Sequence, residues 1–278
     1  MVESRFVQPM DGVVVIKTKE PRAASRRTNE AALHSVADGH YKKVLSITEY
    51  AFAAGRRAVQ KDKLKAALLA KDMKAVVLAV AAAPSVVAAE FEALLPKIVT
   101  KMIEAGGETG LELLREKLRT AEGLRAAAND SFTKMRFDAS NPHAVRWAKK
   151  HVGELIKEIS VTTRQRIAEA VVRLVSGEDH EGAFDEILAA VGDTARADLI
   201  ARTETMTATN QGQREAWGQA VDAGLLSGRE RRTWIATEGA CPLCEELDGE
   251  VVDLDKEYSN GGDGPPLHPN CRCTEGLI

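Results

Sequence analysis

The sequence of 278 residues predicts a mostly α-helical protein, with a helical bundle in its N-terminal half and an α+β C-terminal half. Three observations support this fold class. Hydrophobic residues make up 44% of the chain but aromatic residues only 4%, so Ala, Leu, Val and Ile must do the packing, which favours helices over a β-sandwich. Apolar residues recur at three- and four-residue steps. All four cysteines lie in the last forty residues, beside segments with strand patterns.

Residues 1–28 are predicted to form an extended arm. The segment Val-Val-Val-Ile at residues 13–16 suits a short strand, but Pro9, Gly12 and Pro21 bracket it. Such an arm either docks on a neighbouring molecule or lies over its own body, and a disordered tail is the competing interpretation.

Residues 29–136 are predicted to form a helical domain. Its apolar stripes cover residues 29–59, 64–69, 72–80 and 87–105. Asn29 and Asp72 can cap two of these helices. The glycine pair at residues 106–107 is expected to end one helix, and Thr109 to open the next. No repeat period is evident, so a bundle is favoured over a solenoid.

Residues 137–278 are predicted to form a second domain after a polar connection. Its helices are expected to begin at Asn141-Pro142, at Thr162 or Thr163, near Phe184 and at Asp193. The last of them, running to about Gly224, is the longest helix of this half. Residues 231–237 and 250–254 have strand patterns, and the tail from Cys271 can add a third strand to a small antiparallel sheet.

The middle of the long helix lacks a clean apolar face. One stripe, by the three- and four-residue rule, comprises Thr203, Thr207, Asn210, Arg214 and Trp217. A polar stripe either faces water or forms a buried hydrogen-bonded network against another element. We favour the buried network, because the apolar residues before and after the stripe need a cover and the cysteine-rich segment is the nearest candidate.

The cysteine-rich segment, residues 238–278, has the pattern of a metal-binding knuckle. Cys241 and Cys244 lie two residues apart in one turn, and a second Cys/His group follows after a loop of 23 residues. The predicted ligands are Cys241, Cys244, Cys271 and one of His268 or Cys273, with the fifth group hydrogen-bonded to a ligand. Two disulfides or four separate thiols are the alternatives, and the lack of a secretion signal favours metal.

The metal is predicted to be a structural zinc ion. Nucleobase deaminases also contain a Pro-Cys-x-x-Cys turn, but they place His-x-Glu upstream of it. Here the nearby His268 lies downstream, and five soft donors leave no open position for water. A three-stranded sheet is marginal alone, and structural zinc contributes folding free energy on the order of ten kcal/mol in small modules.

Charge is unevenly distributed along the chain. Residues 1–140 carry 23 Lys and Arg against 17 Asp and Glu, whereas residues 141–278 carry 15 against 24. The basic half permits contact with nucleic acid or an acidic partner, although solvated helix faces are the favoured explanation. The longest uncharged run has fifteen residues, 75–89, and a membrane span needs about twenty, so no membrane contact is expected.

Five blocks of the C-terminal half, taken together, resemble the phage Mu F-type head morphogenesis family, which comprises minor capsid proteins of tailed phages. The blocks are Ala201-Arg202-Thr203-Glu204, Asn210, Trp234, Cys241-x-x-Cys244 with Leu247-Asp248-Gly249, and Pro266-Leu267-His268-Pro269-Asn270-Cys271-Arg272-Cys273. Their order and spacing agree with the family over roughly residues 140–278. The chain departs from it just before Cys241, where Thr237-Glu238-Gly239-Ala240 stand in place of the usual acidic residue and Arg-Thr.

The resemblance implies a structural virion component rather than an enzyme. It implies assembly in the bacterial cytoplasm, a place in the head interior or at the portal vertex, and partnership with the portal protein and with capsid or scaffold proteins. Packaged DNA, bound non-specifically, is a further expected partner. Within the family-like region, the predicted structural polar network comprises Arg202, Thr203, Glu204, Asn210 and Trp234, with Arg202 and Glu204 orienting the strands.

Two other functions were weighed against this one. A DNA-binding ejection protein would show an affinity that falls steeply with salt. A toxin or hydrolase would need a nucleophile, a base and an orienting group, and the sequence offers no such set and no phosphate-binding glycine loop.

Overall fold

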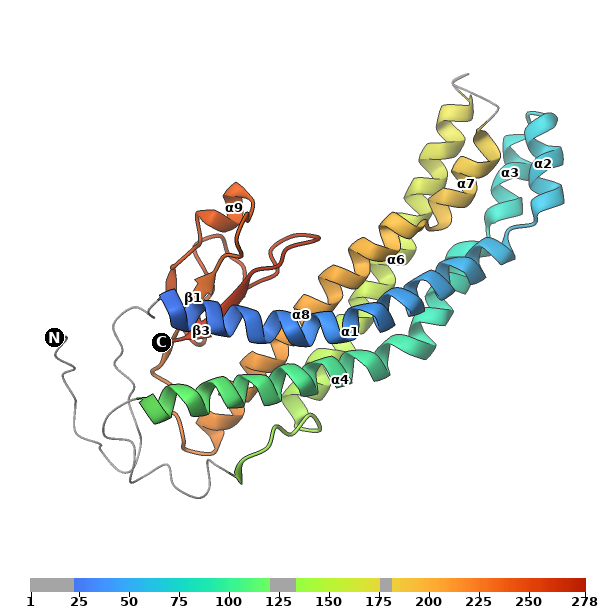
Figure 1. Ribbon diagram of the computed structural model, residues 1–278. Helices are drawn as coiled ribbons and strands as arrows, with labels where there is room; N and C mark the ends of the chain where they lie inside the picture. Colours follow the sequence, from blue (N-terminus) through green and yellow to red (C-terminus); the bar gives the residue numbers. More distant parts are fainter. Residues whose placement is uncertain (1–22, 121–133, 176–181) are drawn as a thin grey trace. The chain divides into compact units, whose positions relative to one another are not determined.

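The computed structural model describes residues 23–120, 134–175 and 182–278, and these are mostly helical, as predicted (Figure 1). The helices are α1 (Ala23–Ala58), α2 (Lys61–Leu69), α3 (Met73–Val80), α4 (Ala83–Thr120), α6 (Pro142–Val175), α7 (Ala183–Val191), α8 (Thr194–Asp222) and α9 (Pro242–Glu245). The strands are β1 (Arg231–Ile235), β2 (Val251–Asp253) and β3 (Thr274–Leu277). The strand predicted at residues 13–16 lies outside the described residues, and residues 23–28, predicted as part of an extended arm, are helical.

The chain divides into two compact units that alternate along the sequence. Unit 1 comprises the residues up to Tyr41, Thr100–Val145 and Arg202–Ile278, and unit 2 comprises Lys42–Val99 and Arg146–Ala201. Helices α1, α4 and α8 each contribute residues to both units. This division differs from the predicted succession of an arm and two domains at residues 1–28, 29–136 and 137–278.

The core of unit 2 forms around two aromatic rings. Phe52 of α1 and Phe91 of α4 pack edge to face, with ring centroids 6.0 Å apart. Gly192 follows α7, and a Cβ added there would lie 2.1 Å from the Phe52 ring. The guanidinium of Arg196 lies 5.1 Å from the centroid of the same ring. Unit 2 thus has a close-packed aromatic core, and the Arg196 guanidinium lies over the ring of Phe52.

Helix α6 continues through Thr162 and Thr163, where the sequence predicted a new helix. Thr163 Oγ1 donates to the carbonyl of Ile159 at 2.7 Å, so its hydroxyl bonds within the helix instead of capping a new one. Arg196 of α8 donates to both hydroxyls, at 2.5 Å for Thr162 and 2.9 Å for Thr163. Burial and the nearby Arg166 lower the pKa of Arg196 to about 10. The threonines therefore serve as acceptors for a partly buried cation.

Helix α4 likewise continues through Gly106 and Gly107, which were predicted to end it. The two glycines permit close packing within unit 1. A Cβ on Gly106 would lie 2.3 Å from the carbonyl oxygen of Thr209 in α8, and a Cβ on Gly212 of α8 would lie 2.2 Å from the carbonyl oxygen of Ile103. Side chains at these positions would force the two backbones apart. The glycine pair thus serves helix packing, and Thr109 lies inside α4.

Several predicted helix boundaries are confirmed by the capping bonds. The Asp72 carboxylate accepts from the Ala75 N–H at 3.1 Å, and the Asn141 side chain accepts from the Ala144 N–H at 2.9 Å. Asp193 accepts from the Arg196 N–H at 2.7 Å and so caps α8. These short polar side chains set helix starts through local bonds, which explains why the sequence alone reveals them.

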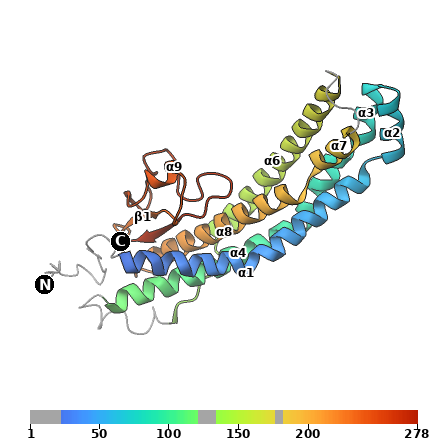
Figure 2. The ribbon, with the colours of Figure 1, turned by 45° about the horizontal axis from the view of Figure 1, so that its top comes forward.

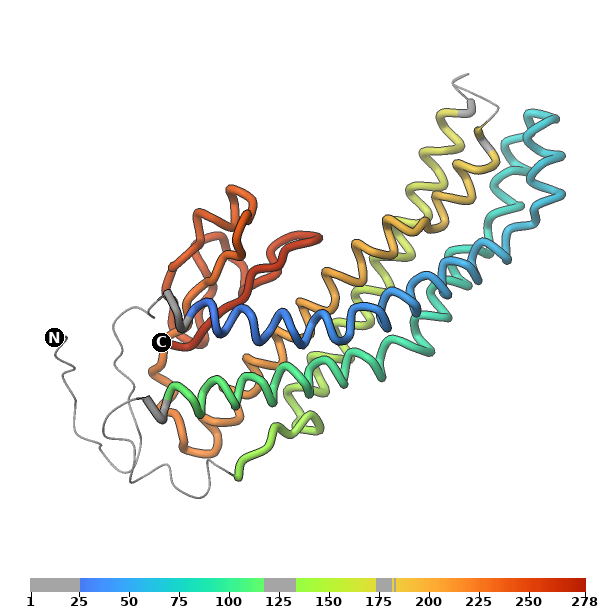
Figure 3. Tube along the Cα trace, viewed as in Figure 1, coloured from blue at the N-terminus to red at the C-terminus, as the bar shows by residue number. Residues whose placement is uncertain are grey.

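The three strands form an antiparallel sheet in the order β2-β1-β3. The outward edge of β3 is covered by helical side chains of unit 1. The carbonyl of Cys273 accepts from Asn210 of α8 at 3.1 Å, that of Glu275 from Asn29 of α1, and that of Leu277 from Lys117 of α4. Figures 2 and 3 show the start of α1 beside this sheet. Side chains from three helices thus occupy the hydrogen-bonding positions that a fourth strand would use along this edge.

One helical stretch, within Met73–Lys117, is long and apolar enough to cross a membrane by length and composition alone. It includes the turn between α3 and α4. Val76, Val87 and Phe91 within it are fully buried, as in the core helices of globular proteins, whereas Leu78 is 63% exposed. The absence of membrane contact remains a prediction.

The packing of α4 on α8 yields a stability prediction. Gly212→Ala adds the better helix former but places a Cβ 2.2 Å from a backbone oxygen, so we expect it to lower the free energy of unfolding by about 1–3 kcal/mol. Gly218→Ala, on the same helix with nothing within 4 Å, is the matched control and should raise it by about 0.5–1 kcal/mol. Chemical denaturation followed by circular dichroism measures both. Equal stability of the two variants would contradict the packing role.

Candidate metal centre

The first pair of candidate ligands lies in a turn preorganised by proline. Cys241 precedes α9, and Pro242 occupies its first turn, where proline needs no N–H partner. The Cys244 N–H donates to the carbonyl of Cys241 at 2.9 Å, which closes the turn. Both thiols can therefore reach one ion from the same short segment.

The second group comes from the loop before β3. The Cys271 N–H donates to the carbonyl of His268 at 3.1 Å, and Asn270 between them has a φ of +63°, a left-handed conformation that asparagine tolerates. His268 Nδ1 lies 2.8 Å from the carbonyl oxygen of Pro269. If Nδ1 carries the proton and donates to that carbonyl, Nε2 is free to bind a metal ion.

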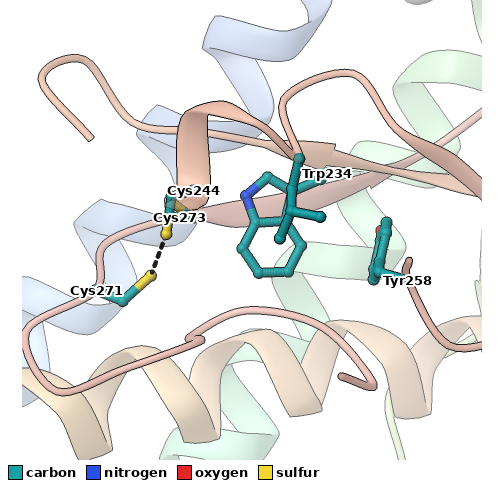
Figure 4. Packing of buried hydrophobic residues seen from close by; sticks show 6 residues of the cluster. Trp234, Cys244, Tyr258, Cys271 and Cys273 are labelled. Atoms are coloured by element: carbon teal, nitrogen blue, oxygen red, sulfur yellow. Dashed lines mark hydrogen bonds between the residues drawn. The ribbon is translucent and has the colours of Figure 1, made fainter. Parts of the chain in front are cut away.

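Three distances among four of the predicted donors are close to those of a tetrahedral site. His268 Nε2 lies 3.1 Å from Cys241 Sγ and 3.4 Å from Cys244 Sγ, and Cys244 Sγ lies 3.7 Å from Cys271 Sγ (Figure 4). A tetrahedral ion with bonds of zinc's length separates sulfur from nitrogen by about 3.5 Å and two sulfurs by about 3.8 Å. These three contacts therefore have the lengths expected between ligands of one metal ion.

Cys273 belongs to a second, overlapping group. Cys241, Cys244 and His268 form one set whose ligand atoms lie within 4.8 Å of one another, and Cys244, Cys271 and Cys273 form another. All four cysteines are free thiols. The structure thus gathers every predicted donor around Cys244, and its distances favour His268 as the partner of Cys241.

The four cysteine thiols differ in their pKa values. A hydrogen bond from Cys273 and backbone N–H groups lower the pKa of Cys271 to about 5, and that same bond raises the pKa of Cys273. The Cys244 N–H lowers the pKa of Cys241, whereas burial raises the pKa of Cys244 to about 12. A bound cation would replace the protons, because thiolates are the ligand form.

An apolar shell surrounds the donors. Trp234 of β1 is fully buried and packs edge to face on Tyr258, with ring centroids 5.2 Å apart (Figure 4). Cys244, Cys271 and Cys273 are each at most 3% exposed within the same cluster, which also includes Leu247. Such a shell keeps water from these three thiols and strengthens their electrostatic interaction with an ion, whereas Cys241 and His268 are partly exposed.

Helix α8 supports the ligand loop with two residues of the predicted polar network. Thr203 Oγ1 accepts from the Asn270 N–H at 2.9 Å. The buried Asn210 donates to the carbonyls of Cys273 at 3.1 Å and Pro265 at 3.3 Å. These bonds fix the backbone on both sides of His268 and Cys271, because one helix contacts the loop before, between and after the two ligands.

The other three residues of the predicted network have separate surroundings. Trp234 lies among the cysteines, and the Arg202 guanidinium lies 5.4 Å from the centroid of the Tyr41 ring in α1. Glu204 is 6% exposed. The stripe therefore contributes to the support of the loop, and the joint orienting role of Arg202 and Glu204 remains a prediction.

Helix α1, at the opposite end of the sequence, also supports the ligand loops. His34 Nε2 lies 2.6 Å from the carbonyl oxygen of Arg272, between two of the cysteines. Arg26 donates to the carbonyl of Trp234 at 3.1 Å and pairs with Asp248, which follows the Cys241–Cys244 turn. Local sequence patterns do not indicate these contacts, because the partners are more than two hundred residues apart.

A buried carboxylate that sequence reasoning missed connects α8 with the sheet. Glu275 of β3 is fully buried, and its carboxylate pairs with Arg214 of α8 and, at 2.6 Å, with Arg232 of β1. Tyr258 donates to it at 3.2 Å. Arg214 also donates to the carbonyl of Pro265 at 3.1 Å, so the network reaches the ligand loop.

The missed network has a recognisable signal in retrospect. Arg232 and Trp234 share one face of β1, because side chains alternate along a strand. A charge on a buried face requires an opposite charge, and Glu275 is the acidic residue of β3. The pairing could have been proposed once the strand register was assumed.

The network yields a second stability prediction. Glu275→Gln leaves Arg232, whose side chain is 5% exposed, without its counter-charge, and we expect a loss of about 3 kcal/mol in the free energy of unfolding. Glu257→Gln, at an exposed position of the same segment, should leave it unchanged. Denaturant titrations of both variants provide the measurement. A similar loss in both would show that the buried pairing contributes little.

Comparison with known proteins gives a family match for the C-terminal part of the chain. Residues 152–275 match the family model described as phage Mu protein F like protein, a range that contains all five candidate metal ligands. Neither the curated proteins nor the solved structures contain a match to the chain. Residues 152–275, the part of the chain that carries the candidate metal centre, are thus similar to the phage Mu protein F like family.

Proposed function

We propose that the protein is a structural head morphogenesis component of a tailed phage, built around a zinc ion. The family suggests a head protein and a virion component. The observation that supports the structural role is the gathering of five soft donors around Cys244 from two loops. The proposal places the protein in the head interior or at the portal vertex, after assembly in the host cytoplasm.

Zinc is the ion that the donor set suits best. Thiolates and imidazole in tetrahedral arrangement are typical of structural zinc. Cys241, Cys244, His268 and Cys271 would hold the ion, and Cys273 would hydrogen-bond to Cys271. Four protein ligands fill a tetrahedral shell, so a catalytic role is not favoured. When bound, the ion would cross-link the Cys241–Cys244 turn to the loop before β3.

The surface of the cysteine-rich segment, residues 238–278, suits a basic partner. Its exposed acidic residues are Glu238, Glu245, Glu246, Asp248, Asp253, Asp255, Glu257 and Asp263. The segment 238–257 contains one base, Lys256, so its surface is strongly acidic. We assign this surface to the portal protein or to capsid or scaffold proteins, because complementary charge steers association and fixes register. Membrane contact has no part in the proposal.

A DNA-binding ejection protein is the second candidate. The observation in its favour is the excess of 23 basic over 17 acidic residues in residues 1–140. Non-specific DNA binding would appear as an affinity that falls linearly with salt on logarithmic axes. An affinity independent of salt would exclude packaged DNA as a partner of this half.

Metal content tests the zinc assignment. We expect about one zinc ion per chain by elemental analysis after purification without chelator, and a melting temperature lowered by chelation. Cys244→Ala, which removes the donor shared by both groups, should lose the metal. Cys273→Ala should retain it with affinity lowered about 10–100-fold. Full loss in Cys273→Ala with retention in a His268→Ala variant would reverse the assignment of the fourth ligand.

Analysis of virions tests the head assignment. Mass spectrometry of purified heads should detect the protein, and Cys244→Ala should reduce its incorporation at least tenfold, because the proposed docking surface depends on the metal. Gly218→Ala, on an open face of α8, is the control and should be incorporated normally. Detection only in the lysate, and never in purified heads, would contradict a virion role.

A further inference from the structure

Unit 1 contains a cavity of about 220 Å³ away from the metal centre. Its walls come from the start of α1, the end of α4, the middle of α8 and the β1-β3 pair. Trp217, Leu114 and Leu277 give it a mostly apolar lining, and Arg26 and Gln213 add polar groups. It is smaller than the pockets of about 300 Å³ or more that take drug-sized ligands. A single amino-acid residue is an occupant of suitable size.

A series of hydrogen bonds determines which polar atom of the cavity wall is available to an occupant. The carbonyl of Glu275 can only accept, so the Asn29 side chain must donate to it through Nδ2. Asn29 Oδ1 then accepts from Gln213 Nε2 at 3.1 Å. Within residues 23–120, 134–175 and 182–278, Gln213 Oε1 is left as a buried acceptor without a hydrogen-bond partner, in a residue that is 1% exposed. An occupant must therefore bring a hydrogen-bond donor to this atom.

The cavity also offers a donor. Arg26, another residue of the cavity wall, has a buried Nε–H that meets no hydrogen-bond acceptor among the described residues. One neutral group that both donates and accepts is the peptide unit. Combined with the apolar lining, this pair of unsatisfied atoms matches one apolar side chain together with its own peptide group.

The occupant cannot simply extend the sheet. The outward carbonyls of β3, at Cys273, Glu275 and Leu277, already accept from Asn210, Asn29 and Lys117. An added strand would have to displace these three side chains. Insertion of a side chain into the cavity leaves the three bonds intact, so the structure favours insertion.

We propose that the cavity binds an apolar residue from positions 13–16 of the same chain. These positions read Val-Val-Val-Ile and precede Ala23, the start of α1, by seven residues or more. Seven extended residues span up to about 25 Å, which reaches the cavity wall at Arg26. A tether of this length gives an effective concentration on the order of millimolar, so a weak contact suffices for occupancy.

Photo-crosslinking of the full-length protein tests this proposal. A benzophenone amino acid in place of Val14 is irradiated, and the cross-linked peptides are identified by mass spectrometry. We expect links to the cavity residues Trp217, Leu114 or Leu277. A mixture of nitrogen-15-labelled and unlabelled protein shows whether each link lies within one chain.

Variants of the cavity sharpen the test. Gln213→Met removes the unpaired acceptor and should lower the yield of these links about tenfold, whereas Gln211→Met on the same helix should not. Leu113→Trp, which narrows the cavity from α4, should have the same effect as Gln213→Met without touching the hydrogen-bond chain. Melting temperatures confirm that each variant is folded. Links joining labelled to unlabelled chains, links elsewhere or an absence of links would each overturn the proposal.

Discussion

The C-terminal part of the molecule depends on the ion pairs of the buried Glu275 carboxylate. A sheet with strands of five, three and four residues has little stability alone. The carboxylate joins it to α8 through Arg214 and to its own central strand through Arg232. Because Arg214 also binds the carbonyl of Pro265, the same charge network positions the loop that carries His268 and Cys271. The donor geometry therefore depends on a helix as much as on the ligand loops.

The sequence predicted the parts of this site that depend on local chemistry. Bonds between residues within four positions produce the turn at Cys241 and Cys244. Elsewhere in the fold, bonds of the same short range produce the helix caps at Asp72 and Asn141. The contacts of His34 and Arg26 with the ligand loops could not be predicted, because each joins residues more than two hundred positions apart. Only the three-dimensional register of α1 against the sheet brings them together.

Two wrong predictions share one physical cause. Glycine and threonine are typical of helix ends, yet each also has a packing use inside a helix. At Gly106 the missing Cβ allows the backbone of α8 to approach, and at Thr163 the hydroxyl accepts from the partly buried Arg196. Local patterns cannot separate these uses, because the deciding partner lies on another helix.

The interleaving of the two units has a consequence for how the protein tolerates cleavage. Since α1, α4 and α8 each belong to both units, neither unit corresponds to one continuous stretch of chain. A fragment beginning at residue 137 would lack the α1 and α4 residues that cap the carbonyls of Glu275 and Leu277. Those carbonyls would then form an open strand edge, prone to pairing between molecules. The α1 and α4 residues are therefore needed to protect the strand edge against aggregation.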